Sequence, residues 1–365
     1  MMTVMHAEKK NKIVLGLSGG VDSTAAALLL KEKGFEVIGL YFNVLNDNEY
    51  VEISAGRERA EKAARHLGVD LIYRDVSSLF DDVVIEDFCN GYISGRTPNP
   101  CIICNPGIKF KVLLETADEI GAEYISTGHY ARVGRFADCD DMKDRPYCVL
   151  KGANEAKDQS YMLYRLGQDV LSRLILPLGQ IPDKKDVRNL ARKAGLENAD
   201  DSESQEICFI AEGEDYVEFI RKRAIVPEGD FVDSSGKVLG KHRGIINYTI
   251  GQRKGLGIAL GKPAFVTAIN SKENTVTLGG SDELLHKTVV SEDNVFIDKN
   301  LTKNILCKQI MAKIRYAAPP APASVKIHDD GTVVTEFEEP QRAPTPGQSI
   351  VFYIGDAVVG GGIIK

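Results

Sequence analysis

The segment Gly16-Leu17-Ser18-Gly19-Gly20-Val21-Asp22-Ser23 constrains the fold of this chain more than any other. An apolar run precedes it and an Ala- and Leu-rich run follows, which predicts a strand, a glycine turn and a helix. Adjacent glycines let the backbone turn tightly and bring its N–H groups close to a ligand. Serine hydroxyls and a helix N-terminus also favour an anion. The segment therefore predicts a phosphate-binding loop. The alternative is a plain turn with Asp22 or Ser23 as the N-cap.

The loop differs from the two common phosphate motifs, because it has neither the G-x-x-x-x-G-K-[ST] nor the G-x-G-x-x-G spacing. It resembles the S-G-G-x-D-S loop of the ATP pyrophosphatase (PP-loop) superfamily. That resemblance implies an enzyme that cleaves ATP between the α- and β-phosphates. Pyrophosphate would lie on the loop, and AMP would be transferred to a substrate oxygen.

The first half of the chain alternates predicted strands and helices, which is typical of an α/β fold with a doubly wound parallel sheet. Ligands of such sheets bind at the carboxyl ends of the strands, where the glycine loop and Thr127-Gly128-His129-Tyr130 both lie. We expect strands at residues 13–17, 36–43, 69–73 and 124–127. We expect helices at residues 22–33, 55–67, 77–92, 108–120, 172–176 and 184–194.

The pattern changes near residue 212. One more helix is expected at residues 216–223, and after it short alternating runs are separated by Gly, Asn, Asp and Pro. Strands are expected at residues 265–269 and 274–278, as a hairpin, and at 332–337, 349–354 and 357–364. We therefore predict a PP-loop catalytic domain at 1–210, a small central β-rich domain at 211–283 and a C-terminal β-barrel at 284–365.

The composition of the chain indicates where in the cell the protein acts and which kinds of partner it binds. No apolar run approaches the roughly 20 residues of a membrane helix, and the polar residues 1–12 do not form a signal peptide, so we expect a cytoplasmic protein without a membrane partner. The formal net charge of −7 argues against non-specific coating of nucleic acid, but a local basic patch can still bind RNA. The seven cysteines are expected to stay as thiols.

Three cysteines stand in contexts that point to chemistry. Cys101 and Cys104 form a C-x-x-C pair within residues 96–105, where two prolines and two asparagines predict a rigid, non-helical loop. This spacing suggests redox chemistry or metal ligation, or two packed cysteines, and a zinc site would need a second pair that the chain lacks. Cys208 is the third candidate, although alone it would be read as a core cysteine. We expect the others to be structural: Cys89, Cys139, Cys148 and Cys307.

An ATP-activating loop combined with isolated reactive thiols suggests sulfur transfer. Adenylation makes a carbonyl oxygen a good leaving group, and a persulfide or sulfide can then replace it. One cysteine would carry the sulfur and a second would assist its release. Both would react as thiolates.

Over almost its whole length the chain resembles the bacterial tRNA-specific 2-thiouridylases, which replace the C2 oxygen of wobble uridine 34 with sulfur. Besides the glycine loop, these segments carry the resemblance: 39–42, 95–100, Cys104-Asn105, 108–110, 127–130, 157–161, 207–209, 251–257, Arg315-Tyr316 and 360–362.

The resemblance implies a role for each matching position. ATP would be bound by Gly16, Leu17, Ser18, Gly19, Gly20, Val21, Asp22, Ser23, Phe42 and Gly128. Asp22 would help to hold Mg²⁺. Cys104 would be the catalytic thiol, and Cys208 would carry a persulfide supplied by a sulfur-relay protein or a cysteine desulfurase. The tRNA would be contacted by Asn99, Pro100, Cys101, His129, Lys157, Asp158, Gln159, Arg315, Tyr316 and Gln348.

The chain departs from the family at Cys101, where many members carry aspartate. Three alternatives follow. A Cys101 thiolate could take over the electrostatic role of the acid. Cys101 could instead form a disulfide with Cys104 or Cys208. The three cysteines could also ligate an iron–sulfur cluster with one iron open to sulfide.

Two other functions compete with tRNA thiolation. One is an adenylating synthetase of the same superfamily that acts on a small metabolite, but such an enzyme has no use for paired reactive thiols. The other is an RNA-binding protein with a vestigial ATP loop, and the intact serines, glycines and aspartate of that loop argue against it.

Overall fold

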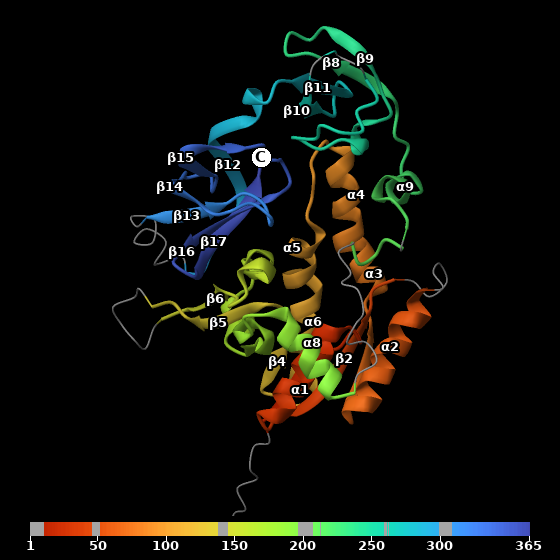
Figure 1. Cartoon of the computed structure of the whole chain (residues 1–365), viewed down its shortest axis with the longest axis vertical. Coiled ribbons are helices and arrows are strands. Elements are labelled where there is room, and N and C mark those ends of the chain that lie inside the picture. Colours follow the sequence, from red (N-terminus) through yellow and green to blue (C-terminus); the bar gives the residue numbers. More distant parts are fainter. Residues whose placement is uncertain are drawn as a thin grey trace, which may run out of the picture. The chain divides into compact units, whose positions relative to one another are not determined.

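The computed structural model (Figure 1) describes residues 11–45, 52–137, 145–195, 207–211, 213–258, 261, 263–298 and 309–365. The chain forms two compact units, and both are discontinuous in sequence. The first unit comprises Met1–Phe80, Asn105–Ser160 and Leu166–Glu203. The second comprises Asp81–Cys104, Tyr161–Arg165 and Ser204–Lys365. Within the described residues, no helix has the length and apolar character needed to cross a membrane.

A five-stranded parallel sheet in the order β3-β2-β1-β4-β7 forms the centre of the first unit. Its strands are β1 Lys12–Gly16, β2 Glu36–Asn43, β3 Asp70–Asp75, β4 Tyr124–Ser126 and β7 Leu174–Ile175. Val14 of the central strand lies opposite Ile38 and Ile125 and has no exposed surface. A central strand that is buried on both faces needs apolar side chains, and Ile13, Val14 and Leu15 supply them in the middle of β1. The expected doubly wound sheet is confirmed.

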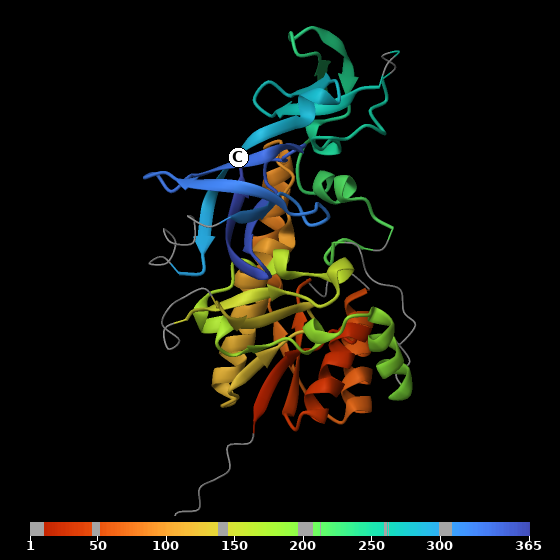
Figure 2. The same ribbon diagram turned by 60° about the vertical axis from the view of Figure 1, so that its left-hand side comes forward.

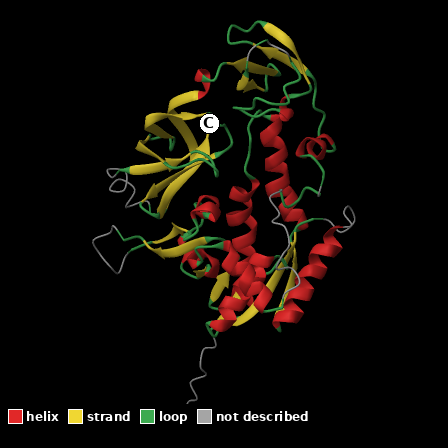
Figure 3. Cartoon of the chain, in the orientation of Figure 1, coloured by secondary structure: helices red, strands yellow, loops and turns green. Residues whose placement is uncertain are grey.

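Helices cover both faces of this sheet (Figures 2 and 3). Ile13 and Leu15 share one buried cluster with side chains of α1 Val21–Glu32, α2 Glu52–Leu67 and α8 Lys184–Lys193. On the other face, α6 Phe110–Glu119 packs against β1 and β4. The remaining elements of the unit are α3 Ser77–Phe80, the π-helical turn Asn105–Lys109, the hairpin β5 Ala131–Arg135 and β6 Tyr147–Lys151, the 3₁₀ turns Glu155–Lys157 and Pro177–Gln180, and α7 Gln168–Leu171.

The helix expected at residues 172–176 is wrong. Helix α7 already ends at Leu171, and after two intervening residues β7 adds the edge strand of the parallel sheet. Pro177 explains the difference, because a residue before proline disfavours the helical region and favours extended backbone. The backbone carbonyl of Arg173 accepts a hydrogen bond from Ile125 N of β4 at 3.0 Å, which ties the extended segment to the sheet.

The second unit holds the predicted β-rich regions and two helices of the first half (Figure 1). A four-stranded sheet has the order β10-β11-β8-β9, with β8 Gly229–Val232, β9 Val238–His242, β10 Phe265–Asn270 and β11 Thr275–Gly279. Six strands in the order β12-β15-β14-β13-β16-β17 close into a barrel through pairing of β12 with β17. They are β12 Leu285–Phe296, β13 Ile310–Lys313, β14 Ala321–Ile327, β15 Val333–Arg342, β16 Ser349–Ile354 and β17 Ala357–Ile364. The helical segments are the π-helical turn Asp81–Ile85, α4 Glu86–Ile93, α5 Pro100–Cys104, α9 Tyr216–Arg221 and the 3₁₀ turns Ile245–Asn247 and Asp282–Leu284. The 3₁₀ turn Ser160–Leu163 starts at Ser160, the last residue of its segment in the first unit, and continues into the second.

The non-helical loop expected at residues 96–105 is also wrong, because its second half is helix α5. Pro100 is the first helical residue, a position where its missing N–H is not needed. The side-chain oxygen of Asn99 accepts a hydrogen bond from Cys101 N at 3.2 Å, as an N-cap does. Ile102 anchors the turn with 1% of its surface exposed. The chain then continues as a π-helical turn that contains Pro106, which cannot donate a regular helical bond.

A buried histidine fixes one end of the four-stranded sheet. His242 is 1% exposed, and its Nδ1 accepts a hydrogen bond from Gly244 N at 3.0 Å. Its Nε2 lies 3.0 Å from the carbonyl oxygen of Asn274, which accepts. A side chain at Gly229 would place its Cβ 2.1 Å from that carbonyl, so glycine is required there. Both ring nitrogens are satisfied only in the neutral form, and desolvation lowers the pKa of His242.

The protein should therefore lose stability as the pH falls. An unfolded histidine titrates near 6.5, whereas native His242 resists protonation. Its contribution is complete above about pH 6.5 and decreases below it, because the unfolded state then binds more protons. We expect the melting temperature of His242→Asn to fall less than that of the wild type between pH 7.5 and pH 5.5, measured by circular dichroism. The exposed His286→Gln on β12 is the control, and equal slopes in all three proteins would contradict the prediction.

Candidate active site

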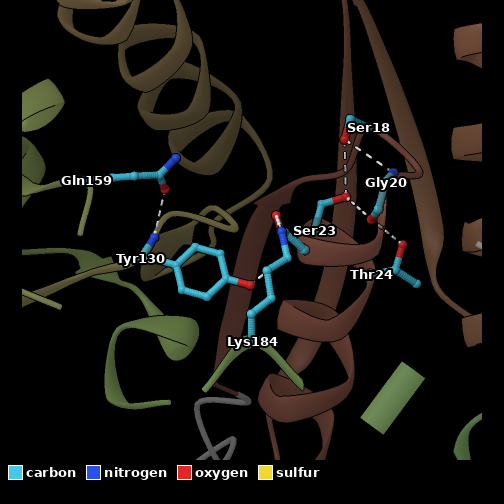
Figure 4. A network of polar contacts seen from close by, with 8 residues as sticks. Ser18, Gly20, Ser23, Thr24, Tyr130, Gln159 and Lys184 are labelled. Carbon is cyan, nitrogen blue, oxygen red and sulfur yellow. Dashed lines mark hydrogen bonds and ion pairs between the residues drawn. The ribbon is translucent and has the colours of Figure 1, made fainter. Parts of the chain in front are cut away.

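The predicted phosphate loop joins β1 to α1 at the carboxyl edge of the sheet. The N-cap of α1 is Gly20, without a side-chain cap, so neither Asp22 nor Ser23 takes that position. The carbonyl of Gly20 accepts hydrogen bonds from Ser23 Oγ at 3.0 Å and from Thr24 Oγ1 at 2.8 Å (Figure 4). The Oγ atoms of Ser18 and Ser23 lie 3.2 Å apart, and Ser18 Oγ accepts from Gly20 N at 3.4 Å. The loop is therefore held by its own hydroxyls.

Three glycines allow the close approaches that build this loop. Gly19 has φ +78°, and a Cβ there would lie 2.4 Å from the backbone carbonyl carbon of Arg59 in α2. A Cβ at Gly128 would lie 2.9 Å from the backbone of Asp22 and Ser23. At Gly16 it would meet the ring of Phe42 at 3.4 Å. The predicted ATP-binding residues from three strand ends are thus brought together.

Asp22 is the charged centre of this region. Its Oδ1 accepts a hydrogen bond from the Tyr130 hydroxyl at 2.6 Å, and its Oδ2 lies 3.3 Å from Lys184 Nζ. Mg²⁺ in nucleotide sites is commonly held by one or two carboxylates together with phosphates. The residues fit that arrangement with Asp22 as a single protein ligand. Lys184, whose side chain is 12% exposed, and Tyr130 were missed from the sequence, although Tyr130 stands in a marker segment and Lys184 begins a basic helix.

The predicted tRNA residues of the first unit are largely engaged within it. His129 stacks on Phe110 with the ring centroids 5.9 Å apart, and its Nδ1 lies 2.7 Å from Thr127 Oγ1. Burial, helped by the charge of Lys109, lowers the pKa of His129 to about 3, so its imidazole is neutral.

Asp158 and Gln159 shape the turn that follows β6. Asp158 is buried, and its Oδ1 accepts from Gly152 N at 2.9 Å and Ser160 N at 3.1 Å. The side-chain oxygen of Gln159 accepts from Tyr130 N at 2.8 Å (Figure 4). Lys157 is half-buried beside them. The contacts of these residues with tRNA remain predictions.

The predicted catalytic thiols lie in the second unit. Cys101 is exposed and Cys104 is partly exposed. Because α5 is helical, a separation of three residues places these two thiols on one face. Cys208 is exposed. Phe209, which follows it, is 1% exposed, and its ring lies 5.3 Å from that of Phe88 and 5.4 Å from that of Phe219. An aromatic anchor therefore holds the segment that presents the Cys208 thiol.

The other described cysteines differ from these three in burial. Cys89 and Cys148 are buried, and burial raises the pKa of both thiols, that of Cys148 to about 12. Such thiols stay protonated and unreactive at neutral pH. Five of the seven cysteines lie in the described part of the chain, and Cys139 and Cys307 lie outside it. Among the described residues no three His, Cys, Asp or Glu side chains gather to hold a metal ion, so the arrangement does not fit a preformed three-cysteine cluster.

The remaining predicted tRNA residues border the barrel. Gln348 Nε2 donates to the Thr97 carbonyl at 2.8 Å, so it fixes the segment before α5. Asn99 caps α5, as described above, and its Nδ2 lies 3.4 Å from Met162 Sδ. Arg315 donates to the Ala343 carbonyl and, at 3.3 Å, to Thr345 Oγ1.

Aromatic rings and a cation lie beside Arg315. The ring of Tyr316 lies 6.2 Å from that of Tyr161, and the ammonium of Lys313 lies 5.5 Å and 5.9 Å from these two ring centroids. Tyrosine faces and cations are what single-stranded RNA bases and phosphates contact. Lys313 was missed from the sequence, where it is one of many lysines.

Known protein families match this chain over nearly its whole length. Three family models match in order: a tRNA methyl transferase HUP domain at residues 11–212, a tRNA methyl transferase PRC-barrel domain at 217–280 and an aminomethyltransferase beta-barrel domain at 287–364. Among solved structures, the U34-tRNA thiolase NcsA from Methanococcus maripaludis with its [4Fe-4S] cluster overlaps 55% of this chain and 63% of its own, at 20% identity and a TM-score of 0.36. That likeness is too low to carry an argument.

Curated relatives align over nearly the full length. The tRNA-specific 2-thiouridylase MnmA of Clostridioides difficile is 42% identical over 97% of this chain and 98% of its own. That of Clostridium acetobutylicum is 45% identical over 97% of this chain and 99% of its own. Identity of this size over whole chains shows that the protein belongs to the family of tRNA-specific 2-thiouridylases.

Proposed function

We propose that this protein is a tRNA-uridine 2-sulfurtransferase, which adenylates the C2 oxygen of wobble uridine 34 and replaces it with sulfur. The observation that carries the proposal is the combination of an intact glycine loop at the carboxyl edge of a parallel sheet with three accessible thiols. The names of the full-length relatives support the same substrate.

The loop would bind ATP and cleave it. The backbone around Gly19 and Gly20 and the hydroxyls of Ser18 and Ser23 would hold the pyrophosphate, aided by the N-terminus of α1. Mg²⁺, when bound with the nucleotide, offsets the negative charge of the phosphates. Lys184 Nζ, paired with Asp22, would add a positive charge close to the same phosphates. The uridine C2 oxygen then attacks the α-phosphate and pyrophosphate leaves.

The thiols would carry out the second half of the reaction. The terminal sulfur of a Cys208 persulfide attacks C2, a C–S bond forms, and the C–O bond to AMP breaks. The Cys104 thiolate attacks the Cys208 sulfur, which leaves the electron pair on the transferred sulfur and forms a Cys104–Cys208 disulfide. An external thiol reduces that disulfide. In an alternative order, Cys104 attacks first and the sulfide released then attacks C2.

A sulfur-relay protein or cysteine desulfurase would load the exposed Cys208. The protein would act in the cytoplasm, where thiols stay reduced. We also propose the domain division 1–210, 211–283 and 284–365, which the ranges of the three family models support.

The rival functions give different products. An adenylating synthetase for a small metabolite would release pyrophosphate without tRNA, and an RNA-binding protein would release none. A methyltransferase, as two of the family descriptions read, would add 14 Da rather than the 16 Da of oxygen-to-sulfur exchange. Pyrophosphate release with and without tRNA, combined with mass spectrometry of the tRNA nucleosides, tests all of these.

Removing either thiol should separate the two half-reactions. We expect Cys104→Ser and Cys208→Ser to abolish 2-thiouridine formation and to keep tRNA-dependent pyrophosphate release, because the loop lies on other elements. Nucleoside mass spectrometry and a pyrophosphate assay measure the two steps. Cys148→Ala is the control, since its buried thiol has no role in the chemistry. Thiolation by Cys208→Ser from a persulfide donor would show that the carrier is another residue.

Removing the Lys184 charge should weaken nucleotide binding. A charge-assisted hydrogen bond contributes about 1.5–3 kcal/mol, so Lys184→Met should raise the KM for ATP roughly 10- to 100-fold. The KM for tRNA should change much less. Lys185→Met removes the same charge from the next, exposed position and should leave the KM for ATP near the wild-type value. Equal effects of the two substitutions would argue against a phosphate contact.

A further inference from the structure

Tyr130 lies where two predicted binding regions of the first unit meet. It follows His129 after β4, and 3% of its surface is exposed. Its hydroxyl reaches Asp22 in the first turn of α1, next to the phosphate loop. Its backbone reaches Gln159 (Figure 4), which lies in the segment Lys157–Gln159 that the family resemblance predicts to contact tRNA. Tyr130 takes no part in the proposed steps of ATP cleavage or sulfur transfer.

The backbone of Tyr130 is fixed from both sides. Its N–H donates to Gln159 Oε1 at 2.8 Å, and its carbonyl accepts from Gln159 N at 2.9 Å. A Cβ at Gly152 would lie 2.8 Å from the same carbonyl, so the chain after β6 packs directly on it. Asp158 holds that chain in place through Gly152 N and Ser160 N. A shift of the turn at residues 157–159 would therefore move the Tyr130 backbone.

The side chain of Tyr130 contacts Asp22, which lies at the predicted phosphate loop. Its hydroxyl donates to Asp22 Oδ1 at 2.6 Å, a short, charge-assisted hydrogen bond. Lys184 Nζ lies 3.3 Å from the other oxygen of Asp22 and 5.6 Å from the Tyr130 ring centroid. The carboxylate orientation is thus set jointly by Tyr130 and Lys184. A rigid, buried ring transmits a backbone displacement directly to its hydroxyl.

We propose that Tyr130 is a positioning residue that couples occupancy of the segment Lys157–Gln159 by RNA to the orientation of Asp22 at the ATP loop. RNA on that segment and nucleotide on the loop then favour each other's binding. The inference rests on the proposed function, because it takes tRNA and ATP as the two ligands. By linkage, the factor by which tRNA tightens nucleotide binding equals the factor by which nucleotide tightens tRNA binding.

The test measures this coupling factor directly. The dissociation constant of α,β-methylene ATP, which cannot be cleaved between its α- and β-phosphates, is measured with and without saturating tRNA. The ratio of the two constants cancels any change in nucleotide affinity alone. We expect a ratio of about 5 to 150 for the wild type, the usual range of such couplings. For Tyr130→Phe, which keeps the buried ring and removes only the hydroxyl, we expect a ratio below about 3.

Matched variants separate coupling from folding. Tyr73→Phe removes another hydroxyl that donates to a carboxylate, Glu61 at 2.7 Å, in the same unit and should keep the wild-type ratio. Gln159→Leu removes the other end of the connection and should lower the ratio as Tyr130→Phe does. The reciprocal measurement, tRNA affinity with and without nucleotide, should give the same ratios.

Two results would overturn the coupling: an unchanged ratio in Tyr130→Phe, or a ratio near 1 in a wild-type protein that thiolates tRNA. A wild-type protein without tRNA-dependent pyrophosphate release would contradict the proposed function itself, so the two failures are distinguishable.

Discussion

The close approach of backbone segments at the carboxyl edge of the parallel sheet is the constraint on which the first unit depends. Gly19 seats the loop against α2, and Gly128 lets the chain after β4 reach the first turn of α1. A Cβ at either position would fall within 3 Å of backbone atoms that cannot move without moving a helix. Because the backbone of α2 and of the first turn of α1 lies at these positions, only glycine fits there. The same edge of the sheet holds the Ser18 and Ser23 hydroxyls 3.2 Å apart and fixes Asp22 through the Tyr130 hydroxyl.

The extent of burial distinguishes the five described cysteines more clearly than their spacing in the sequence does. In Cys148 the thiol is protonated at neutral pH because its thiolate would lose hydration. Cys101 and Cys208 keep contact with water, and each directly precedes a buried apolar residue, Ile102 or Phe209, that holds the backbone. The same arrangement, an exposed thiol next to a buried apolar residue, occurs at Cys101 in helix α5 and at Cys208 in an irregular segment. A thiol held in this way has a defined position and stays hydrated.

Much of this organisation could be predicted from the sequence, because periodicity and glycine placement are local signals. The strand at Glu36–Asn43 and the hairpin of β10 and β11 follow from such signals. Helix α5 could not be predicted, because prolines and asparagines at a helix start look like those of a loop until the cap at Asn99 is seen. The edge strand β7 has two residues, too few for any period. Lys184 was missed because its partner Asp22 is 162 residues away in the chain.

Several residues that are predicted to contact tRNA already use their polar atoms in hydrogen bonds within the protein. These atoms would have to give up those bonds before they could bind RNA. Asp158 binds two backbone N–H groups, Gln348 binds the Thr97 carbonyl, and Arg315 binds the Ala343 carbonyl. Leaving a buried polar group such as Asp158 without a partner costs about 1–3 kcal/mol, so exchanging its bonds for RNA contacts would be unfavourable. The bonds of the partly exposed Gln348 and Arg315 also have to break before these side chains can bind RNA. These side chains therefore fix the loops that bear them, and their contacts with tRNA remain predictions. The Tyr316 ring and the Lys313 ammonium, which stack and attract without exchanging a buried hydrogen bond, suit direct contact with RNA better.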